Sequence, residues 1–204
     1  MVNNTKLKII DWNCFFSDCK SYRWSLDLKI SLRKKEIIFI GLNPSKSNQN
    51  FLDNTTKKII KICNKYNYGK IKLINLFGLV STSPKLLQIH NDPIGFLNNK
   101  IIENNIYYWS KSMNCDLWIG WGNKGTLFDR DMQVYKIIKK YISYKKKNFS
   151  RNKKPLLINK TKYNNPMHPL YCPDNSKLLK LNLEISLLKF ICYSIKNESK
   201  NYFY

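Results

Sequence analysis

Three short apolar runs, each closing on a glycine, most constrain how this chain folds. They are EIIFIG (36–41), KIKLINLFG (70–78) and DLWIGWG (116–122). Runs of this kind are typical of strands buried on both faces, as in parallel sheets covered by helices. Residues 53–69 and 97–113 lie between them and predict helices, from capping residues and from apolar side chains at helical spacing. This alternation predicts a doubly wound α/β fold.

The flanking segments extend this core. Residues 22–33 alternate apolar and polar side chains, which predicts a strand with one wet face, added antiparallel to the sheet. After the third run, residues 127–143 favour a helix and the basic run 144–155 indicates a solvated loop. LLIN (156–159) favours a short last parallel strand. Residues 176–196 place Leu and Ile at helical spacing behind a serine, which predicts a closing helix.

We therefore expect one domain over residues 1–204, because this length suits a single core. Its expected parts are a β extension (1–35), an α/β core (36–175) and a C-terminal helix (176–196). The expected architecture is a three-layer α/β/α sandwich. Its central, mostly parallel four-stranded sheet carries the antiparallel N-terminal addition.

The charge and composition indicate the class of partner. The formal net charge of +23 favours a polyanion such as nucleic acid, although an AT-rich genome also drives codon usage toward Lys, Asn and Ile. No apolar run approaches the roughly 18 residues that cross a bilayer, and the N-terminus lacks the pattern of a signal peptide. We expect a soluble cytoplasmic protein that binds no membrane and has DNA, another nucleic acid or a nucleotide as its partner.

The cysteines give no sign of a metal site. The six of them lie far apart without a C-x-x-C pair, and the chain has two histidines, His90 and His168. Zinc sites usually show closely spaced ligand pairs. We expect reduced cysteines, no metal and no cofactor, and we interpret His90 as structural.

Site candidates follow the strand ends, because ligands bind at the carboxyl ends of strands in an open parallel sheet. Asn43, Pro44 and Ser45 follow the first run. Asn75 and Phe77 end the second run, and Trp121, Gly122 and Asn123 end the third. A last loop, NNPMHPLY (164–171), places a proline on either side of His168, which fixes its backbone.

Several of these motifs resemble one family. GLNPSKSNQNFLDNTT (41–56), NLF (75–77), GWG (120–122) and HPLY (168–171), preceded by YRWSL (22–26), look like the domain of unknown function sixteen-forty-three, an uncharacterised bacterial and phage family. The resemblance covers most of residues 22–173. It implies no activity, because the function of that family is not established.

The same order of motifs is also similar to that of the uracil-DNA glycosylase superfamily. That resemblance implies that Asn43, in GLNP, positions the attacking water, and that Asn75, in KLIN, hydrogen-bonds a flipped pyrimidine. It matches IGWG to a third strand motif and implies that His168 stabilises the anionic leaving base. Asn43 cannot take a proton from water as an aspartate would, so slow hydrolysis or a narrow substrate range is expected.

The expected catalytic pair is thus Asn43 and His168. The expected substrate-binding residues are Gly41, Leu42, Pro44, Ser45, Phe51, Asn75, Phe77, Trp121, Gly122, Asn123, Pro169, Leu170 and Tyr171. Among them, Phe51, Phe77 and Trp121 are the candidate stacking platforms for a base. Leu170 and Tyr171 are the candidates for the wedge that displaces a base from duplex DNA.

Simpler interpretations stand beside these roles. Gly41 and Pro44 also suit a tight turn, although a glycine there would let a nucleotide approach the backbone. Asp53 and Thr55 either cap the next helix or act in the site. On the simpler interpretation, the Asn75 amide only hydrogen-bonds a neighbouring loop, because buried amides need partners.

Three functions remain open from the sequence. The first is hydrolysis of the N-glycosidic bond of a modified pyrimidine. The second is a module that binds nucleic acid or a nucleotide without cleaving it, and the third is a transferase that modifies a base in the same pocket. Release of free base separates the first from the second, and a requirement for a donor molecule identifies the third.

Overall fold

The three glycine-terminated runs form the middle of one mixed sheet. In the computed structural model, which describes residues 9–45, 52–148 and 154–181, strand β3 (Glu36–Gly41) lies between β4 (Lys70–Asn75) and β5 (Cys115–Ile119). It runs parallel to both. Alternate β3 side chains enter different cores: Ile37 and Phe39 enter one, and Ile38 and Ile40 the other. Burial on both faces explains the continuous apolar run.

Shorter or more exposed strands complete the sheet on either side. The order within the described residues is β1-β2-β4-β3-β5-β6-β7. As predicted, β2 (Arg23–Lys29) is antiparallel to β4, and β1 (Asp11–Phe16) is in turn antiparallel to β2. At the other side β6 (Leu156–Leu157) is parallel to β5, and β7 (Leu179–Lys180) is antiparallel to β6.

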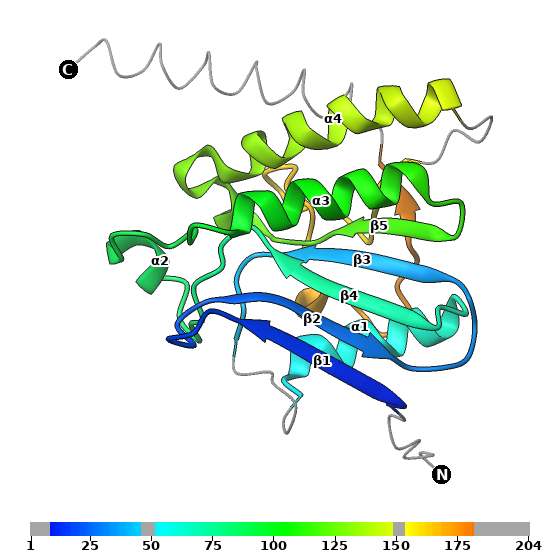
Figure 1. Ribbon diagram of the computed structural model, residues 1–204, viewed down its shortest axis with the longest axis horizontal. Helices are drawn as coiled ribbons and strands as arrows, with labels where there is room; N and C mark the ends of the chain where they lie inside the picture. The colour runs from blue at the N-terminus through cyan, green and yellow to red at the C-terminus, as the bar shows by residue number, and fades with distance from the viewer. Residues whose placement is uncertain (1–8, 46–51, 149–153, 182–204) are drawn as a thin grey trace.

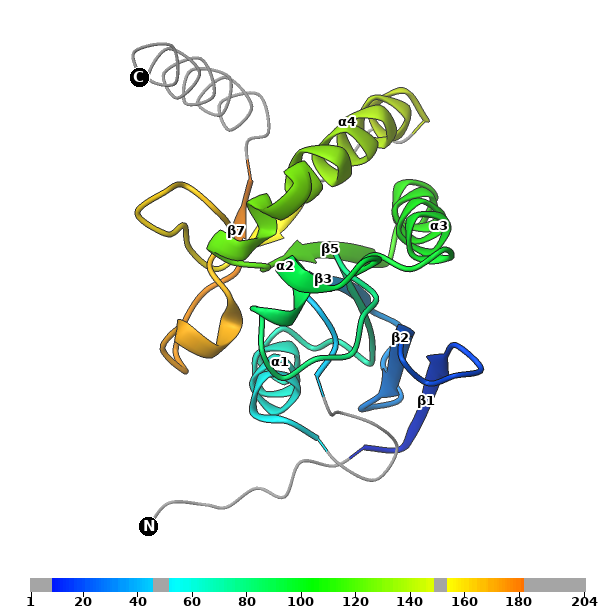
Figure 2. The ribbon, with the colours of Figure 1, turned by 90° about the vertical axis from the view of Figure 1, so that its left-hand side faces the viewer.

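Helices cover both faces of the sheet (Figures 1 and 2). Helix α1 (Asn54–Lys65) packs on one face through Ile59, Ile60 and Ile62. Helices α3 (Asn98–Lys111) and α4 (Arg130–Asn148) pack together on the other. The remaining helical elements are α2 (Leu86–Ile89) and the 3-10 turns η1 (Asn123–Asp129) and η2 (Pro169–Tyr171). Among the described helices, none has the length and apolar character needed to cross a bilayer.

Two predictions outside the central strands were wrong in part. The predicted loop over residues 144–155 begins too early, because α4 continues to Asn148. The predicted helix over residues 176–196 does not start at its serine, because Leu179–Lys180 form β7 on the edge of β6. Residues 149–153 and 182–204, which hold the rest of these two segments, lie outside the described residues. An unpaired strand edge offers backbone hydrogen bonds, and here these override a helical pattern.

Helix α4 begins with two buried charged residues. The Arg130 Nε donates to the Leu76 carbonyl at 2.8 Å, and its Nη1 donates to Gln133 at 2.8 Å. The Asp131 Oδ1 accepts the Met132 amide at 2.8 Å, whereas its Oδ2 has no hydrogen-bond partner among the described residues. Burial raises the pKa of Asp131 to about 6, because a charged carboxylate is poorly solvated there.

We predict that Asp131→Asn stabilises the protein at neutral pH. A carboxyl whose pKa is raised on folding favours the folded state below its ordinary pKa of 3.8, and this stability is lost as the pH rises through about 6. Urea unfolding at pH 7.5 should show a gain on the order of 2 kcal/mol, and at pH 4 almost none. Asp18→Asn, at an exposed turn residue far from Asp131 in the chain, is the control. Destabilisation by Asp131→Asn at pH 7.5 would contradict the prediction.

Candidate functional site

A pocket of about 630 Å³ opens at the carboxyl ends of the central strands. Figure 2 looks toward this end, where α1, α2 and the segment carrying η2 surround the ends of the strands. The predicted residues that line the pocket are Gly41, Leu42, Asn43, Ser45, Asp53, Thr55, Asn75, Trp121, Gly122, Asn123, His168, Leu170 and Tyr171. The fold therefore brings together residues separated by more than a hundred positions in the chain.

Other predicted residues lie elsewhere. Pro44 and Pro169 are buried but do not line the pocket, and Phe51 lies outside the described residues. Phe77 is fully buried in the core shared with α3 and α4, so its prediction as a stacking platform was wrong. Its amide donates to the Leu42 carbonyl at 2.9 Å, which continues the β3–β4 pairing and keeps the ring inside the core.

Gly41 and Asn75 are direct neighbours in the β3–β4 register. A Cβ at position 41 would lie 2.8 Å from the Asn75 Oδ1 and 3.0 Å from the Phe39 ring. Glycine therefore makes room for a side chain of the protein itself, rather than only for a ligand. The Asn75 side chain is 93% buried, and its Nδ2 has no hydrogen-bond partner among the described residues. A buried donor without a partner is costly, so this amide is available to a ligand.

The Asn43 side chain is held by the loop that follows β4 and by its own neighbour in the chain. Its Nδ2 donates to the Ser81 carbonyl at 2.8 Å and to the Pro44 carbonyl at 3.0 Å. The Ser81 amide in turn donates to the Pro44 carbonyl at 2.9 Å. These bonds use the nitrogen of the Asn43 amide and leave its Oδ1 as an acceptor.

The segment that carries His168 is fastened to two strand ends. The Gly122 amide donates to the Pro166 carbonyl at 2.8 Å, and the Met167 amide donates to the Asn159 carbonyl at 2.8 Å. Gly122 has a φ of +72°, a conformation that side chains other than glycine rarely adopt. The loop after β5 and the His168 loop thus position each other, as the convergence of strand ends predicted.

His168 is a neutral donor in this setting. Its Nδ1 accepts the Leu170 amide at 3.3 Å, so the proton of the neutral imidazole sits on Nε2. Burial lowers the pKa of His168 to about 4, against the opposing influence of the Asp53 charge. An imidazole N–H held in this way can stabilise developing negative charge without first carrying a positive charge.

Asp53 caps α1 and also lines the pocket. Its Oδ1 accepts the Thr56 amide at 2.7 Å, which confirms the capping role, and its Oδ2 accepts the Ser45 hydroxyl. The same carboxylate raises the pKa values of Arg23 and His168, in each case against the larger effect of burial. Capping and a place in the pocket are therefore compatible.

Arg23 is a pocket residue that the sequence did not single out as part of the site. It is 95% buried at the start of β2, which reaches the pocket because β2 runs antiparallel to β4. One signal was present: 36 basic residues include only four arginines, and two of these, Arg23 and Arg130, are buried. Arginine suits buried charged positions better than lysine. Further unpredicted lining residues include Phe39, Thr56, Ser81, Thr82, Lys124, Thr161 and Met167.

Aromatic side chains lie at two depths in the pocket. Phe39 packs edge-on against Trp118 with ring centroids 4.8 Å apart, and Trp121 is buried against Tyr135 at 5.2 Å. Tyr171 is 76% exposed and lies 5.9 Å from the His168 ring. Phe39 and Trp121 therefore form fixed walls, while Tyr171 provides an apolar face at the mouth.

A second cavity, of about 460 Å³, lies at the opposite end of the strands. Its walls carry two ion pairs, Lys70–Glu36 at 3.0 Å and Lys72–Asp27 at 2.5 Å. Charges paired with each other do not converge on a ligand as the donors of the larger pocket do. Within the described part of the chain, no three His, Cys, Asp or Glu side chains come together to hold a metal ion.

Comparison with known proteins supports the first of the two resemblances. A family model described as "Protein of unknown function (DUF1643)" matches residues 23–170, which is more than half of the chain. No curated protein and no solved structure matches the chain. The match spans every pocket residue named above except Tyr171.

We predict that His168 stays neutral down to about pH 4 with its proton on Nε2. Because burial lowers its pKa on folding, folding stability should fall as the pH drops from about 6.5 through about 4. ¹⁵N-edited NMR of the two imidazoles, assigned with His90→Ala, would measure this. A midpoint near 6.5 for His168 would contradict the prediction.

Proposed function

The chain belongs to the DUF1643 family, and from its pocket we propose that it acts on a nucleobase, hydrolysing the N-glycosidic bond of a modified pyrimidine in DNA. One observation carries the proposal. Asn43, Asn75 and His168 line one pocket, and the described structure commits neither the Asn43 Oδ1, nor the Asn75 Nδ2, nor the His168 Nε2–H to a hydrogen bond.

These three groups match the needs of the reaction. The bond between C1′ of the sugar and the base nitrogen breaks, and its electron pair leaves with the base as an anion. A water oxygen bonds to C1′ and loses a proton to solvent. The His168 N–H would donate to the base oxygen on which charge develops, and the Asn43 carbonyl would orient the water. The Asn75 amide would read the edge of the extruded base.

The fold supports the same proposal. Strands β4, β3, β5 and β6 are parallel neighbours, with α1 on one face and α3 and α4 on the other. We propose that this arrangement is the three-layer, uracil-DNA glycosylase-like architecture that the order of motifs implies. Tyr171 at the mouth suits a base that must leave its stack, and we assign it the contact with the neighbouring base.

One observation favours a slow enzyme or a binding module instead. Asn43 cannot accept a proton from water, and both oxygens of Asp53, the carboxylate in the pocket, already accept hydrogen bonds. Without a general base, catalysis would depend on stabilising the leaving group and the sugar cation. The intracellular location that this function requires, and the DNA partner, are part of the proposal.

The direct test is release of free base. Oligonucleotides carrying uracil, hydroxymethyluracil and other modified pyrimidines, single- and double-stranded, should lose one base, detected by mass spectrometry. His168→Ala should lower the rate about 10²- to 10³-fold, the cost of removing a donor aimed at developing charge. Asn43→Ala should also reduce it, and His90→Ala is the matched control. No release from any substrate, with binding that depends on His168 and Asn75, would replace hydrolysis with recognition or donor-dependent modification.

Asn75→Ala should separate recognition from folding. Truncation removes a buried donor without a partner, which stabilises, and the packing of the side chain on Gly41, which destabilises. These effects offset each other, so the free energy of unfolding should change by less than about 1 kcal/mol. Affinity for an oligonucleotide with the preferred base should fall about tenfold or more, the worth of one buried hydrogen bond. Affinity for the same oligonucleotide without that base should not change. An equal loss for both would show that Asn75 does not read the base.

A further inference from the structure

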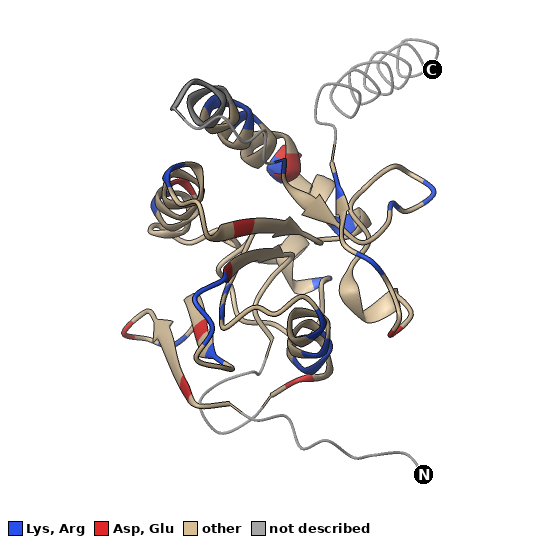
Figure 3. Ribbon diagram, turned by 90° about the vertical axis from the view of Figure 1, so that its right-hand side faces the viewer, with Lys and Arg blue, Asp and Glu red and all other residues tan. Residues whose placement is uncertain are grey.

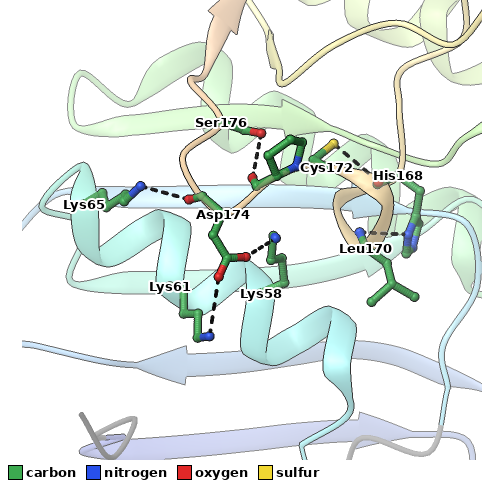
Figure 4. Close-up of polar contacts among 9 residues, drawn as sticks. Lys58, Lys61, Lys65, His168, Leu170, Cys172, Asp174 and Ser176 are labelled. Atoms are coloured by element: carbon green, nitrogen blue, oxygen red, sulfur yellow. Dashed lines mark hydrogen bonds and ion pairs between the residues drawn. The ribbon is translucent and has the colours of Figure 1, made fainter. Parts of the chain in front are cut away.

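Three lysines of α1 converge on one residue of the segment that carries His168. The Nζ atoms of Lys58 and Lys61 approach the two carboxylate oxygens of Asp174, the second at 3.8 Å. The Lys65 Nζ donates to the Asp174 backbone carbonyl at 2.8 Å. Figure 4 shows the three side chains rising from one face of the helix toward this single residue. Three ammonium groups thus surround three oxygens.

The three lysine ammonium groups repel one another, and Asp174 offsets this repulsion only partly. Residues 54–65 contain four lysines and no acidic residue, and Figure 3 shows α1 banded with basic residues alone. Like charges three or four residues apart on a helix destabilise it. Asp174 supplies one negative charge against three positive ones, and its side chain is 70% exposed. The helix face therefore retains a net positive charge that a further anion would neutralise.

The place of this face relative to the pocket indicates which anion. Thr55 and Thr56 at the start of α1 line the pocket. Lys58 and Lys61 lie about 4.5 and 9 Å beyond Thr55 along the helix axis. Tyr171 lines the pocket, and Asp174 comes three residues after it in the chain. A strand with one base in the pocket would have its neighbouring phosphates within reach of this row.

We propose that Lys58, Lys61 and Lys65 form the contact for the phosphate backbone of the bound strand, and that Asp174 occupies this contact in the free protein. Its three oxygens stand where phosphate oxygens bind. The proposal rests on the proposed function only in taking a nucleic-acid strand as the partner. It adds two features to that function: the bound strand runs along α1, and the Asp174 carboxylate competes with the phosphates of the strand.

The test is binding of a fluorescent single-stranded oligonucleotide, followed by anisotropy over a salt series. Asp174→Asn should raise affinity roughly threefold more than Glu103→Gln, since only the first removes a competing carboxylate from the phosphate contact. Glu103 is the matched control, because its carboxylate pairs with Lys140 at 3.0 Å on the other face of the sheet. Equal effects of the two variants would overturn the proposal.

A second pair of variants tests the lysines directly. The double variant Lys61→Gln/Lys65→Gln changes two exposed lysines and should weaken binding. It should also reduce the magnitude of the slope of log K against log[salt] by about 1.4, twice the contribution of one phosphate contact on a single strand. Lys139→Gln/Lys140→Gln on α4 changes the charge equally and should leave that slope near the wild-type value. Equal salt-dependence slopes for the two double variants would refute a strand contact. It would also be refuted if free dUMP displaced the labelled oligonucleotide as effectively as unlabelled oligonucleotide does at the same phosphate concentration. Base release is measured separately, so a protein that binds along α1 without releasing base would sink only the glycosylase proposal.

Discussion

The parallel pairing of β3 and β4 places Gly41 beside Asn75, and the candidate site depends on that adjacency. The Asn75 amide folds across the bare Cα of Gly41, where any Cβ would come within 2.8 Å of its oxygen. The backbone beyond Asn75 is held by two other elements. Asn98 of α3 donates to the Leu76 carbonyl at 2.7 Å, and Arg130 of α4 donates to the same carbonyl. The orientation of one amide therefore draws on the sheet and on both helices of the opposite face.

The pocket concentrates polar groups that burial makes costly. The Asn75 Nδ2 forgoes a hydrogen bond in the free protein, a loss of about 1–3 kcal/mol for a buried donor. Burial also keeps His168 neutral by lowering its pKa. A ligand that accepted the Asn75 hydrogen bond would recover the first of these costs. Loss of stability at such a position is common in binding sites, and it is consistent with the function proposed above.

Net charge and the placement of charge are separate matters in this protein. Lysine is abundant throughout the chain, so the total of +23 says little about any one surface. On the α3–α4 face, Lys140 is paired with Glu103. On α1 the lysines share a single exposed carboxylate beside the pocket. What sets the α1 lysines apart is their convergence on one residue, Asp174, in the segment that carries His168.

The central strands, α1 and its Asp53 cap were determined by the sequence, because short apolar runs and capping residues act over a few neighbouring positions. The strand-end rule also located Asn43, Asn75 and His168 in one pocket, since parallel strands end at the same edge. The local pattern did not place Phe77 correctly. Strand pairing continues beyond the end of β4, and this pairing turns the Phe77 ring into the core.

Arg23 and β7 show what only the tertiary structure decided. Arg23 reaches the pocket because β2 pairs antiparallel with β4, an arrangement that brings the start of one strand to the end of another. Leu179 and Lys180 join β6 although their surroundings have helical spacing, because an open strand edge competes for their backbone. The chain alone determined which segments are buried; which side chains meet was decided by contacts between segments far apart in sequence.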